Sequence, residues 1–275
     1  MGANIATAII SVASIGLLCA ALLAVASKVM AVKSDERVVR LRACLPGANC
    51  GACGFVGCDG YADALAADGS EVKANLCTPG GKPVARELSS IMGVDFEDLV
   101  GQVAFVHCRG DANARKRKME YSGIQTCKSA KQLFGGQNSC VFGCLGFGDC
   151  AEVCPNGAIC IDSGLARVDT RKCGGCGLCA KNCPNGVIFV EPDTITTVVT
   201  CRNVEKGAVV RKKCSSGCIG CMRCVRECAA GAIAVVDNLA IIDYSKCEGC
   251  GKCAEVCVTK CIQQADFRGV FSSAE

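Results

Sequence analysis

The sequence is poor in the residues that usually build large hydrophobic cores and active sites. Among 275 residues there is no tryptophan, aromatic residues make up 4%, and His107 is the single histidine. A core without large side chains can take its volume from a bound inorganic group, as small metal domains do. One histidine is also too few for the mixed ligand sets of many zinc sites. The scarcity therefore favours metal sites made of thiolates alone.

Motifs for catalysis on a bound substrate are also missing. No G-x-G-x-x-G sequence follows a strand and opens a helix, so a dinucleotide site is not expected. No nucleophile and base pair or two-carboxylate site can be assigned, and Gly135-Gly136 is too short for a phosphate loop. We therefore expect a protein that carries electrons one at a time and has no catalytic residues or further cofactor site of its own.

The net charge of +4 is only mildly basic. This balance argues against bulk binding of nucleic acid and is compatible with docking an acidic protein.

Cysteine is the abundant residue, with 28 copies. So high a content is typical of disulfide scaffolds or of metal-rich proteins. Disulfides would require an oxidising compartment, whereas the many C-x-x-C spacings indicate metal binding.

Two cysteine rows lie between Cys140 and Cys183. The second has the spacing C-x2-C-x2-C-x3-C-P, which is typical of ferredoxins with two [4Fe–4S] clusters, and the first is stretched to C-x3-C-x5-C-x3-C-P. In such rows three cysteines bind one cluster and the fourth binds the other. The predicted ligand sets are Cys140, Cys144, Cys150 and Cys183 for one cluster, and Cys173, Cys176, Cys179 and Cys154 for the other.

A second double row repeats this arrangement further along the chain. The approach to the second row repeats as well, with V-D-T-R-K-C before Cys173 and I-D-Y-S-K-C before Cys247. Crossed ligation predicts the sets Cys218, Cys221, Cys224 with Cys257, and Cys247, Cys250, Cys253 with Cys228.

A separate group of cysteines precedes both double rows. Residues 45–58 read L-P-G-A-N-C-G-A-C-G-F-V-G-C, and their glycines let the backbone close around a cluster. The predicted ligands are Cys50, Cys53, Cys58 and Cys77, with Cys44 as an alternative ligand that we interpret instead as a buried small thiol.

Four further cysteines flank the first double row, and we predict that they hold a sixth cluster. They are Cys108, Cys127, Cys201 and Cys214. The alternatives are four free thiols, or a ligand set that includes Cys44. Cys160 and Cys261 occupy small apolar positions of the repeat, and Cys19 is interpreted as inert.

Basic residues crowd the same four cysteines. A solvated face and a landing site for an acidic ferredoxin are the two interpretations. The residues are Arg109, Arg115, Lys116, Arg117, Lys118, Lys128, Arg211, Lys212 and Lys213.

The N-terminal segment has no charged residue from Ile5 to Ser27. About 23 residues of helix would reach roughly 34 Å, enough to cross a hydrocarbon core of about 30 Å. The basic residues that follow, from Lys28 to Arg42, predict a cytoplasmic location for the rest of the chain. We therefore expect a single-pass anchor in the cytoplasmic (inner) membrane rather than a cleaved signal peptide.

The L-P-G-A-N-C-G-A-C-G-F-x-G-C motif, followed by ferredoxin rows, resembles the iron–sulfur B subunit of the Rnf complex over nearly the whole chain. The resemblance implies an electron-transfer component of a membrane-bound ferredoxin:NAD⁺ oxidoreductase. It would accept electrons from reduced ferredoxin and pass them to other membrane subunits, while the complex translocates Na⁺ or H⁺. An electron donor to a corrinoid or nitrogenase system, and a zinc-binding structural scaffold, are the alternatives.

These observations predict an α+β chain with tandem units. The expected division is a transmembrane helix at 1–30, a single-cluster domain at 31–100, a first ferredoxin-like module with its flanks at 101–214, and a second module at 215–275.

Overall fold

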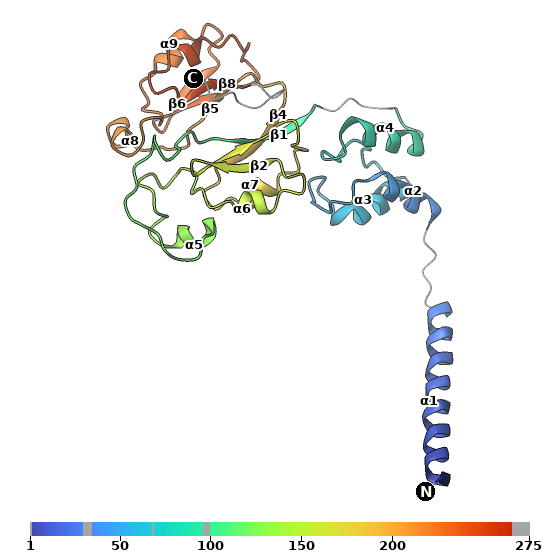
Figure 1. The fold of residues 1–275 in the computed structure, drawn as a ribbon. Helices are drawn as coiled ribbons and strands as arrows, with labels where there is room; N and C mark the ends of the chain where they lie inside the picture. The colour runs from blue at the N-terminus through green and yellow to red at the C-terminus, as the bar shows by residue number, and fades with distance from the viewer. Residues whose placement is uncertain (1, 30–34, 68, 96–99, 266–275) are drawn as a thin grey trace.

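The computed structural model describes residues 2–29, 35–67, 69–95 and 100–265 (Figure 1). Within them lie a long N-terminal helix, a small helical domain and two small α+β units.

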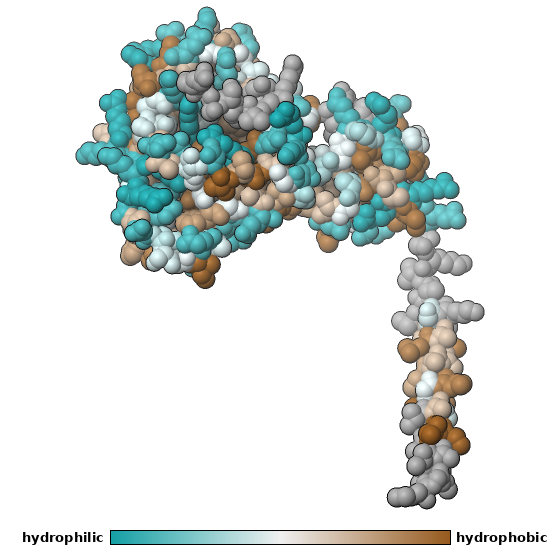
Figure 2. Space-filling view, in the orientation of Figure 1, coloured by the Kyte–Doolittle hydropathy of each residue, from teal (hydrophilic) through white to brown (hydrophobic). Residues whose placement is uncertain are grey.

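The N-terminal segment does form a helix, α1 (Gly2–Val29), and its described apolar side chains, such as Leu17, are exposed (Figure 2). However, no helix in the described part of the chain combines the length and apolar character that a bilayer crossing requires. A crossing needs about 20 consecutive, mostly apolar residues. The predicted transmembrane helix at residues 5–27, and the single-pass anchor with it, is therefore wrong. Lys33, counted in the predicted basic flank, lies outside the described residues.

The small helical domain packs three helices around one core. Leu41, Tyr61, Leu65 and Leu88 are its large buried side chains, and the Tyr61 hydroxyl donates to the carbonyl of Lys73 at 2.7 Å. The helices are α2 (Glu36–Cys44), α3 (Gly57–Ala66) and α4 (Gly81–Met92).

The first ferredoxin unit (residues 102–192) contains two antiparallel strand pairs with short helices between them. Its first strand pairs with its last, with Ala104 opposite Val190, and the middle strands form a hairpin. The elements are β1 (Gln102–Val106), α5 (Cys127–Gln132), α6 (Asp149–Glu152), β2 (Ile159–Asp162), β3 (Leu165–Val168), α7 (Leu178–Asn182) and β4 (Ile188–Pro192).

The second ferredoxin unit (residues 197–264) repeats that order. Its first strand again pairs with its last, and its middle strands again form a hairpin. The elements are β5 (Thr197–Val199), α8 (Gly207–Lys213), α9 (Arg223–Glu227), β6 (Ile233–Val236), β7 (Leu239–Ile242), α10 (Lys252–Glu255) and β8 (Ile262–Gln264).

Each unit therefore takes its first strand from the sequence that precedes its cysteine rows. The predicted division after residue 214 falls within the second unit, because β5 pairs with β8. The two units also contact each other directly. The amide of Lys116 donates to the Lys213 carbonyl at 2.9 Å, and the amide of Ser215 donates to the Ala114 carbonyl at 2.8 Å.

The cores of both units consist of small aliphatic residues and cysteines. In the first unit, Ala104, Ile159, Leu165 and Val187 pack with buried cysteine side chains. This composition agrees with the expectation that bound clusters supply much of the core volume.

Candidate functional site: cysteine pockets along the chain

In the small helical domain the four predicted cysteines line one pocket. They are Cys50, Cys53, Cys58 and Cys77. Asn49 shapes the loop, because its side-chain oxygen accepts a hydrogen bond from the Cys58 amide at 2.8 Å. Gly57 must be glycine here, since a β-carbon would lie 2.9 Å from that oxygen and the residue has a φ of +75°. Cys44 does not line the pocket, and its thiol donates to the Arg40 carbonyl instead.

A second complete set of predicted ligands lies in the first ferredoxin unit, where one pocket is lined by Cys154, Cys173, Cys176 and Cys179. Backbone amides point at two of the sulfurs: Ala158 donates to Cys154 Sγ and Ala104 donates to Cys173 Sγ, both at 3.3 Å. Such N–H···S bonds stabilise the negative charge of a cluster and tune its potential.

A third complete set lies in the second unit, in a pocket lined by Cys218, Cys221, Cys224, Cys257 and also Cys261. The Cys261 sulfur is 3.6 Å from Cys257 Sγ. A hydrogen bond with Cys261 lowers the pKa of Cys257. Cys261 is buried in a small apolar position, as predicted, but it also contacts predicted ligands.

The last predicted set of the second unit is Cys228, Cys247, Cys250 and Cys253. Burial raises the pKa of Cys253, and the nearby Cys247 and Cys250 raise it further. The amide of Ala232 donates to Cys228 Sγ at 3.3 Å, which repeats the Ala158–Cys154 contact of the first unit.

The remaining pocket of the first unit differs from its predicted set at one position. Its cysteines are Cys144, Cys150 and Cys183, joined by Cys127 and not by Cys140. Burial raises the pKa of Cys150 to about 12, with further contributions from Cys144, Cys127 and Cys183.

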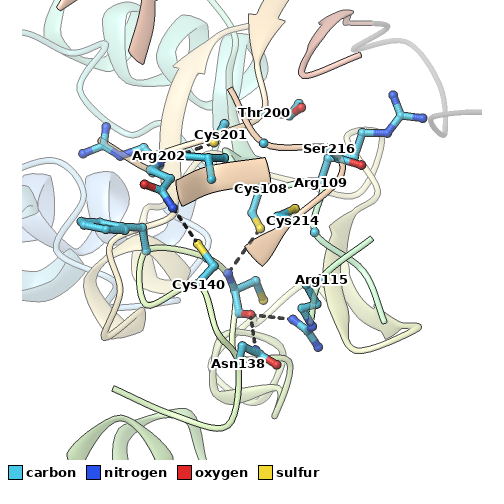
Figure 3. A pocket seen from close by; sticks show the side chains of 17 residues that line it. Cys108, Arg109, Arg115, Asn138, Cys140, Thr200, Cys201, Arg202, Cys214 and Ser216 are labelled. Carbon is cyan, nitrogen blue, oxygen red and sulfur yellow. Dashed lines mark hydrogen bonds between the residues drawn. The ribbon is translucent and has the colours of Figure 1, made fainter. Parts of the chain in front are cut away.

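A larger pocket lies where the two units meet (Figure 3). Cys108, Cys140, Cys201 and Cys214 line it, together with Cys144. Burial raises the pKa of Cys108 to about 12 and that of Cys201 to about 11. Three arginines, Arg109, Arg115 and Arg202, also line this pocket.

The donor sets fit iron–sulfur clusters. Among the described residues, no three Cys, His, Asp or Glu side chains are close enough to hold one metal ion. The thiols instead surround pockets, and their burial disfavours bare thiolates, a cost that a cluster's iron offsets by binding the sulfur. The amide donors to Cys154, Cys173 and Cys228 also suit cluster sulfur.

The predicted basic residues do not all face solvent. Arg115 is 7% exposed and donates to the carbonyls of Cys144 at 2.7 Å and Gly164 at 2.9 Å, so it has a structural role. Lys213 pairs with Glu205 at 2.5 Å. The exposed members are Lys116, Arg117, Lys118, Lys128, Arg211 and Lys212, and Arg109 is partly exposed.

Comparison with known proteins supports iron–sulfur binding by this chain. A family model for an Fe-S cluster matches residues 45–79, and one described as "4Fe-4S binding domain" matches residues 166–189. The B subunit of the "Ion-translocating oxidoreductase complex" of Methanosarcina acetivorans is 38% identical over 96% of this chain and 99% of the relative. The chain belongs to this family, the B subunits of the Rnf complexes.

Two further members of the Rnf B family show the same likeness. The B subunit of the "Na(+)-translocating ferredoxin:NAD(+) oxidoreductase complex" of Acetobacterium woodii is 40% identical over 87% of this chain and 72% of the relative. That of the "Proton-translocating ferredoxin:NAD(+) oxidoreductase complex" of Clostridium ljungdahlii is 40% identical over 90% of this chain and 86% of the relative.

Sequence reasoning missed the residues that position the cysteines of this Rnf B family member. Asp149 is 6% exposed and accepts hydrogen bonds from the amides of Cys127 and Lys128 at 2.7 and 3.1 Å. Asn203 is 1% exposed and donates to Cys140 Sγ through its side chain and to Cys201 Sγ through its amide, both at 3.4 Å. Neither residue is marked by cysteine spacing, although Asn203 follows Cys201 closely.

Proposed function

We propose that this chain is the polyferredoxin subunit of an Rnf-type ferredoxin:NAD⁺ oxidoreductase complex. It accepts electrons from reduced ferredoxin and relays them to other subunits of the complex, whose redox reaction drives translocation of Na⁺ or H⁺. The observation that supports this most directly is a series of cysteine pockets within one chain of the Rnf B family.

The predicted cysteines hold at least five [4Fe–4S] clusters, which when bound take up and release one electron each. The chain contributes what sets their properties. Glycine-rich turns let the backbone approach the sulfurs, and the amides of Ala104, Ala158 and Ala232 donate to them. Small apolar side chains exclude water from the pockets, which affects the potential of each cluster.

The exposed basic residues form the docking surface for ferredoxin. The amide of Lys116 donates to the Lys213 carbonyl, so the segment that carries Lys116, Arg117 and Lys118 runs beside the end of α8, which carries Arg211 and Lys212. Basic residues from both ferredoxin units thus lie together. A positive surface raises the rate of encounter with an acidic partner, and salt screens the effect.

The cysteine-rich part of the chain functions on the reducing, cytoplasmic side of the membrane across which the complex moves ions. Thiols stay reduced in that compartment, as cluster ligation requires.

The test is anaerobic purification of the full chain, followed by iron and sulfide counts and by assay in the assembled complex. We expect about 20 irons or more per chain, since each cubane holds four. Ferredoxin-dependent reduction of NAD⁺ should require this chain. Reduction of NAD⁺ by donors that pass electrons directly to the partner subunits should not require it. A colourless protein with zinc in place of iron would overturn the proposal.

A second measurement tests the docking surface. Replacing Lys116, Arg117 and Lys118 by glutamate should slow electron transfer from ferredoxin at low salt and remove most of its salt dependence. The matched control reverses Arg167, Arg171 and Lys172, basic residues of the same unit outside this surface. Equal slowing by both variants would contradict the docking site.

A further inference from the structure

Cys127 and Cys140 line pockets other than those that cysteine spacing predicts for them. We propose that Cys108, Cys140, Cys201 and Cys214 hold a sixth [4Fe–4S] cluster at the junction of the two units, and that Cys127 completes the set of Cys144, Cys150 and Cys183. The assignment deepens the proposed function and relies on it for the cluster type.

The backbone provides the first argument, because it shows where the first row begins. In the other three rows, a residue with positive φ lies two positions after the first cysteine: Gly175, Gly220 and Gly249. A second positive φ lies two positions before the third cysteine, at Gly177, Met222 and Gly251.

The first row has the same two turns at Gly146 and Gly148. They match only if Cys144 is its first cysteine and Cys150 its third. Cys140 then lies outside the row, and Phe147 stands where the other rows carry Cys176, Cys221 and Cys250. The first unit therefore lacks the middle ligand of its first row.

Cys127 is placed to replace that missing ligand. Its side chain lines the same pocket as Cys144, Cys150 and Cys183. Asp149 holds it there by accepting hydrogen bonds from the Cys127 and Lys128 amides. Helix α5, which begins at Cys127, is also held to the second row by a hydrogen bond from Lys131 to the Pro184 carbonyl.

The four cysteines of the junction are related by the repeat. The sequence V-H-C-R (residues 106–109) begins at the last residue of β1, and V-T-C-R (residues 199–202) begins at the last residue of β5, so Cys108 and Cys201 are equivalent. Likewise C-V-F-G-C-L-G (residues 140–146) matches C-S-S-G-C-I-G (residues 214–220), so Cys140 and Cys214 are equivalent. Each unit thus contributes the same two positions, and the site has an internal pseudo-twofold symmetry.

The geometry of the junction suits a cluster (Figure 3). Glycines keep the space between the sulfurs open: a β-carbon at Gly143 would lie 3.3 Å from Cys108 Sγ and 3.7 Å from Cys140 Sγ. One at Gly110 would lie 3.4 Å from Cys214 Sγ and 3.7 Å from Cys108 Sγ.

Amide donors surround the same sulfurs. Asn203 donates to Cys140 and Cys201, and the Cys144 amide donates to Cys108 Sγ, each at 3.4 Å. These N–H···S bonds and the nearby arginines stabilise the negative charge of a thiolate-bound cluster. The sixth site also lies beside the basic docking surface, because Arg115 forms a β-bridge with Cys214 and Lys116 follows it. It is therefore placed to receive electrons there and to connect the two units.

Double variants of the anaerobically purified full chain test the assignment by iron content and low-temperature EPR. Replacing two cysteines that bind the same cluster removes only that cluster. Replacing one cysteine in each of two clusters removes both. We expect C140A/C201A to lose about four irons and C127A/C140A about eight, because one cubane holds four. If Cys140 belonged with Cys144 and Cys127 with Cys201, the C140A/C201A variant would lose about eight instead. That result would overturn the assignment of Cys140 to the sixth cluster and of Cys127 to the Cys144 cluster.

A rescue variant tests the role of Cys127 separately. Phe147→Cys restores the middle position of the row, so C127A/F147C should regain the iron and the EPR signal that C127A loses. The exposed Cys160, which lines none of these pockets, is the matched control, and C160A should retain full iron. Full iron in C140A, C201A and C127A would show that these thiols are free and would overturn the sixth cluster, while about 20 irons would still support the proposed function.

Discussion

The two ferredoxin units have the same strand order and the same turns in their cysteine rows, yet one cysteine position of the equivalent pockets is filled differently. In the second unit Cys221 lies within its row, between Gly220 and Met222. In the first unit Phe147 occupies that position and Cys127 reaches the pocket from a separate helix. Within one fold, a cysteine held by the local backbone needs little support, whereas a cysteine from elsewhere in the chain depends on tertiary contacts.

The largest difference between the two units should be in iron content, after removal of the Asp149 carboxylate that holds Cys127. Asp149→Ala leaves the Cys127 and Lys128 amides without their acceptor, at a cost of about 2–3 kcal/mol for a charged hydrogen-bonding group. We expect the variant to lose about four irons on purification, because one cluster would be poorly held. Arg223, exposed at the equivalent position of the second unit, is the control, and R223A should keep full iron. Full iron in D149A would mean that Cys127 stays in place without the Asp149 carboxylate.

The hairpin turns of the two units should differ in stability. Both turns have positive φ at two residues, Ser163-Gly164 and Asp237-Asn238. Buried Arg115 donates to the Gly164 carbonyl, whereas the exposed Asn238 donates to the Val204 carbonyl at 3.0 Å.

Arg115→Ala should therefore lower the free energy of unfolding by about 2–3 kcal/mol, and Asn238→Ala by about 1 kcal/mol or less. Denaturant unfolding of the cluster-loaded chain measures both, and R115K should recover only part of the loss, since lysine lacks the planar two-carbonyl reach of arginine. Equal losses of unfolding free energy in R115A and N238A would show that the burial of Arg115 does not make its hydrogen bond stronger than that of Asn238.

Acid should affect the first unit more than the second, through His107. This residue takes the place of Thr200 in the repeat, and both donate their amides across the strand pair, to the Val187 and Cys261 carbonyls. Burial lowers the pKa of His107 from 6.5 to about 4, so the folded state resists protonation. The stability that neutral His107 provides is complete above about pH 6.5 and is lost as the pH falls toward 4.

His107→Thr should remove this dependence. By linkage, acidification from pH 7.5 to 5.5 costs the parent chain about 1 kcal/mol more than the variant. Hydrogen exchange of the β1–β4 pair, compared with the β5–β8 pair as an internal control, measures the difference. A parallel pH response of the two strand pairs in the parent chain would contradict it.

The smallest effect should be a shift in cluster potential. Cys261, whose sulfur is 3.6 Å from that of Cys257, occupies the position that Val187 has in the first unit. A thiol that donates to a ligand sulfur favours the more negative, reduced cluster. Removing one hydrogen bond of about 0.5–1.5 kcal/mol corresponds to a fall of about 20–60 mV in a one-electron potential.

Cys261→Val should therefore lower the potential of the Cys218 cluster, and Val187→Cys should raise that of the cluster held by Cys183. Redox titrations followed by EPR measure both shifts, with the cluster of the small helical domain as an internal reference. Shifts of the same sign in both variants would rule out hydrogen bonding as the cause.

Much of the site was predictable because three cysteines of each row are close together in the sequence. Three of the predicted sets line one pocket each, those of Cys50, Cys154 and Cys218 with their partners. The presence of Cys127 instead of Cys140 in the pocket of Cys144, Cys150 and Cys183 was not predicted, since cysteine spacing alone makes C-x3-C-x5-C look like a widened row. The positive φ values at Gly146 and Gly148 show instead a regular row that lacks one ligand. The predicted membrane-spanning helix, inferred from an uncharged run of about 23 residues and the basic residues after it, was wrong, since no helix in the described part of the chain is long and apolar enough to cross a membrane.

The sequence by itself determined the cysteine rows, the tandem repeat and the resemblance to the Rnf B family. Within each row the cysteines are only a few positions apart, so backbone turns such as those at Gly175 and Gly177 set their places. Only the tertiary structure decided that β1 and β5 begin their units, that Arg115 is buried, and which pockets Cys127 and Cys140 enter. The physical reason is that these features depend on contacts between distant segments, such as Asp149 with Cys127 and Asn203 with Cys140, which no local spacing encodes.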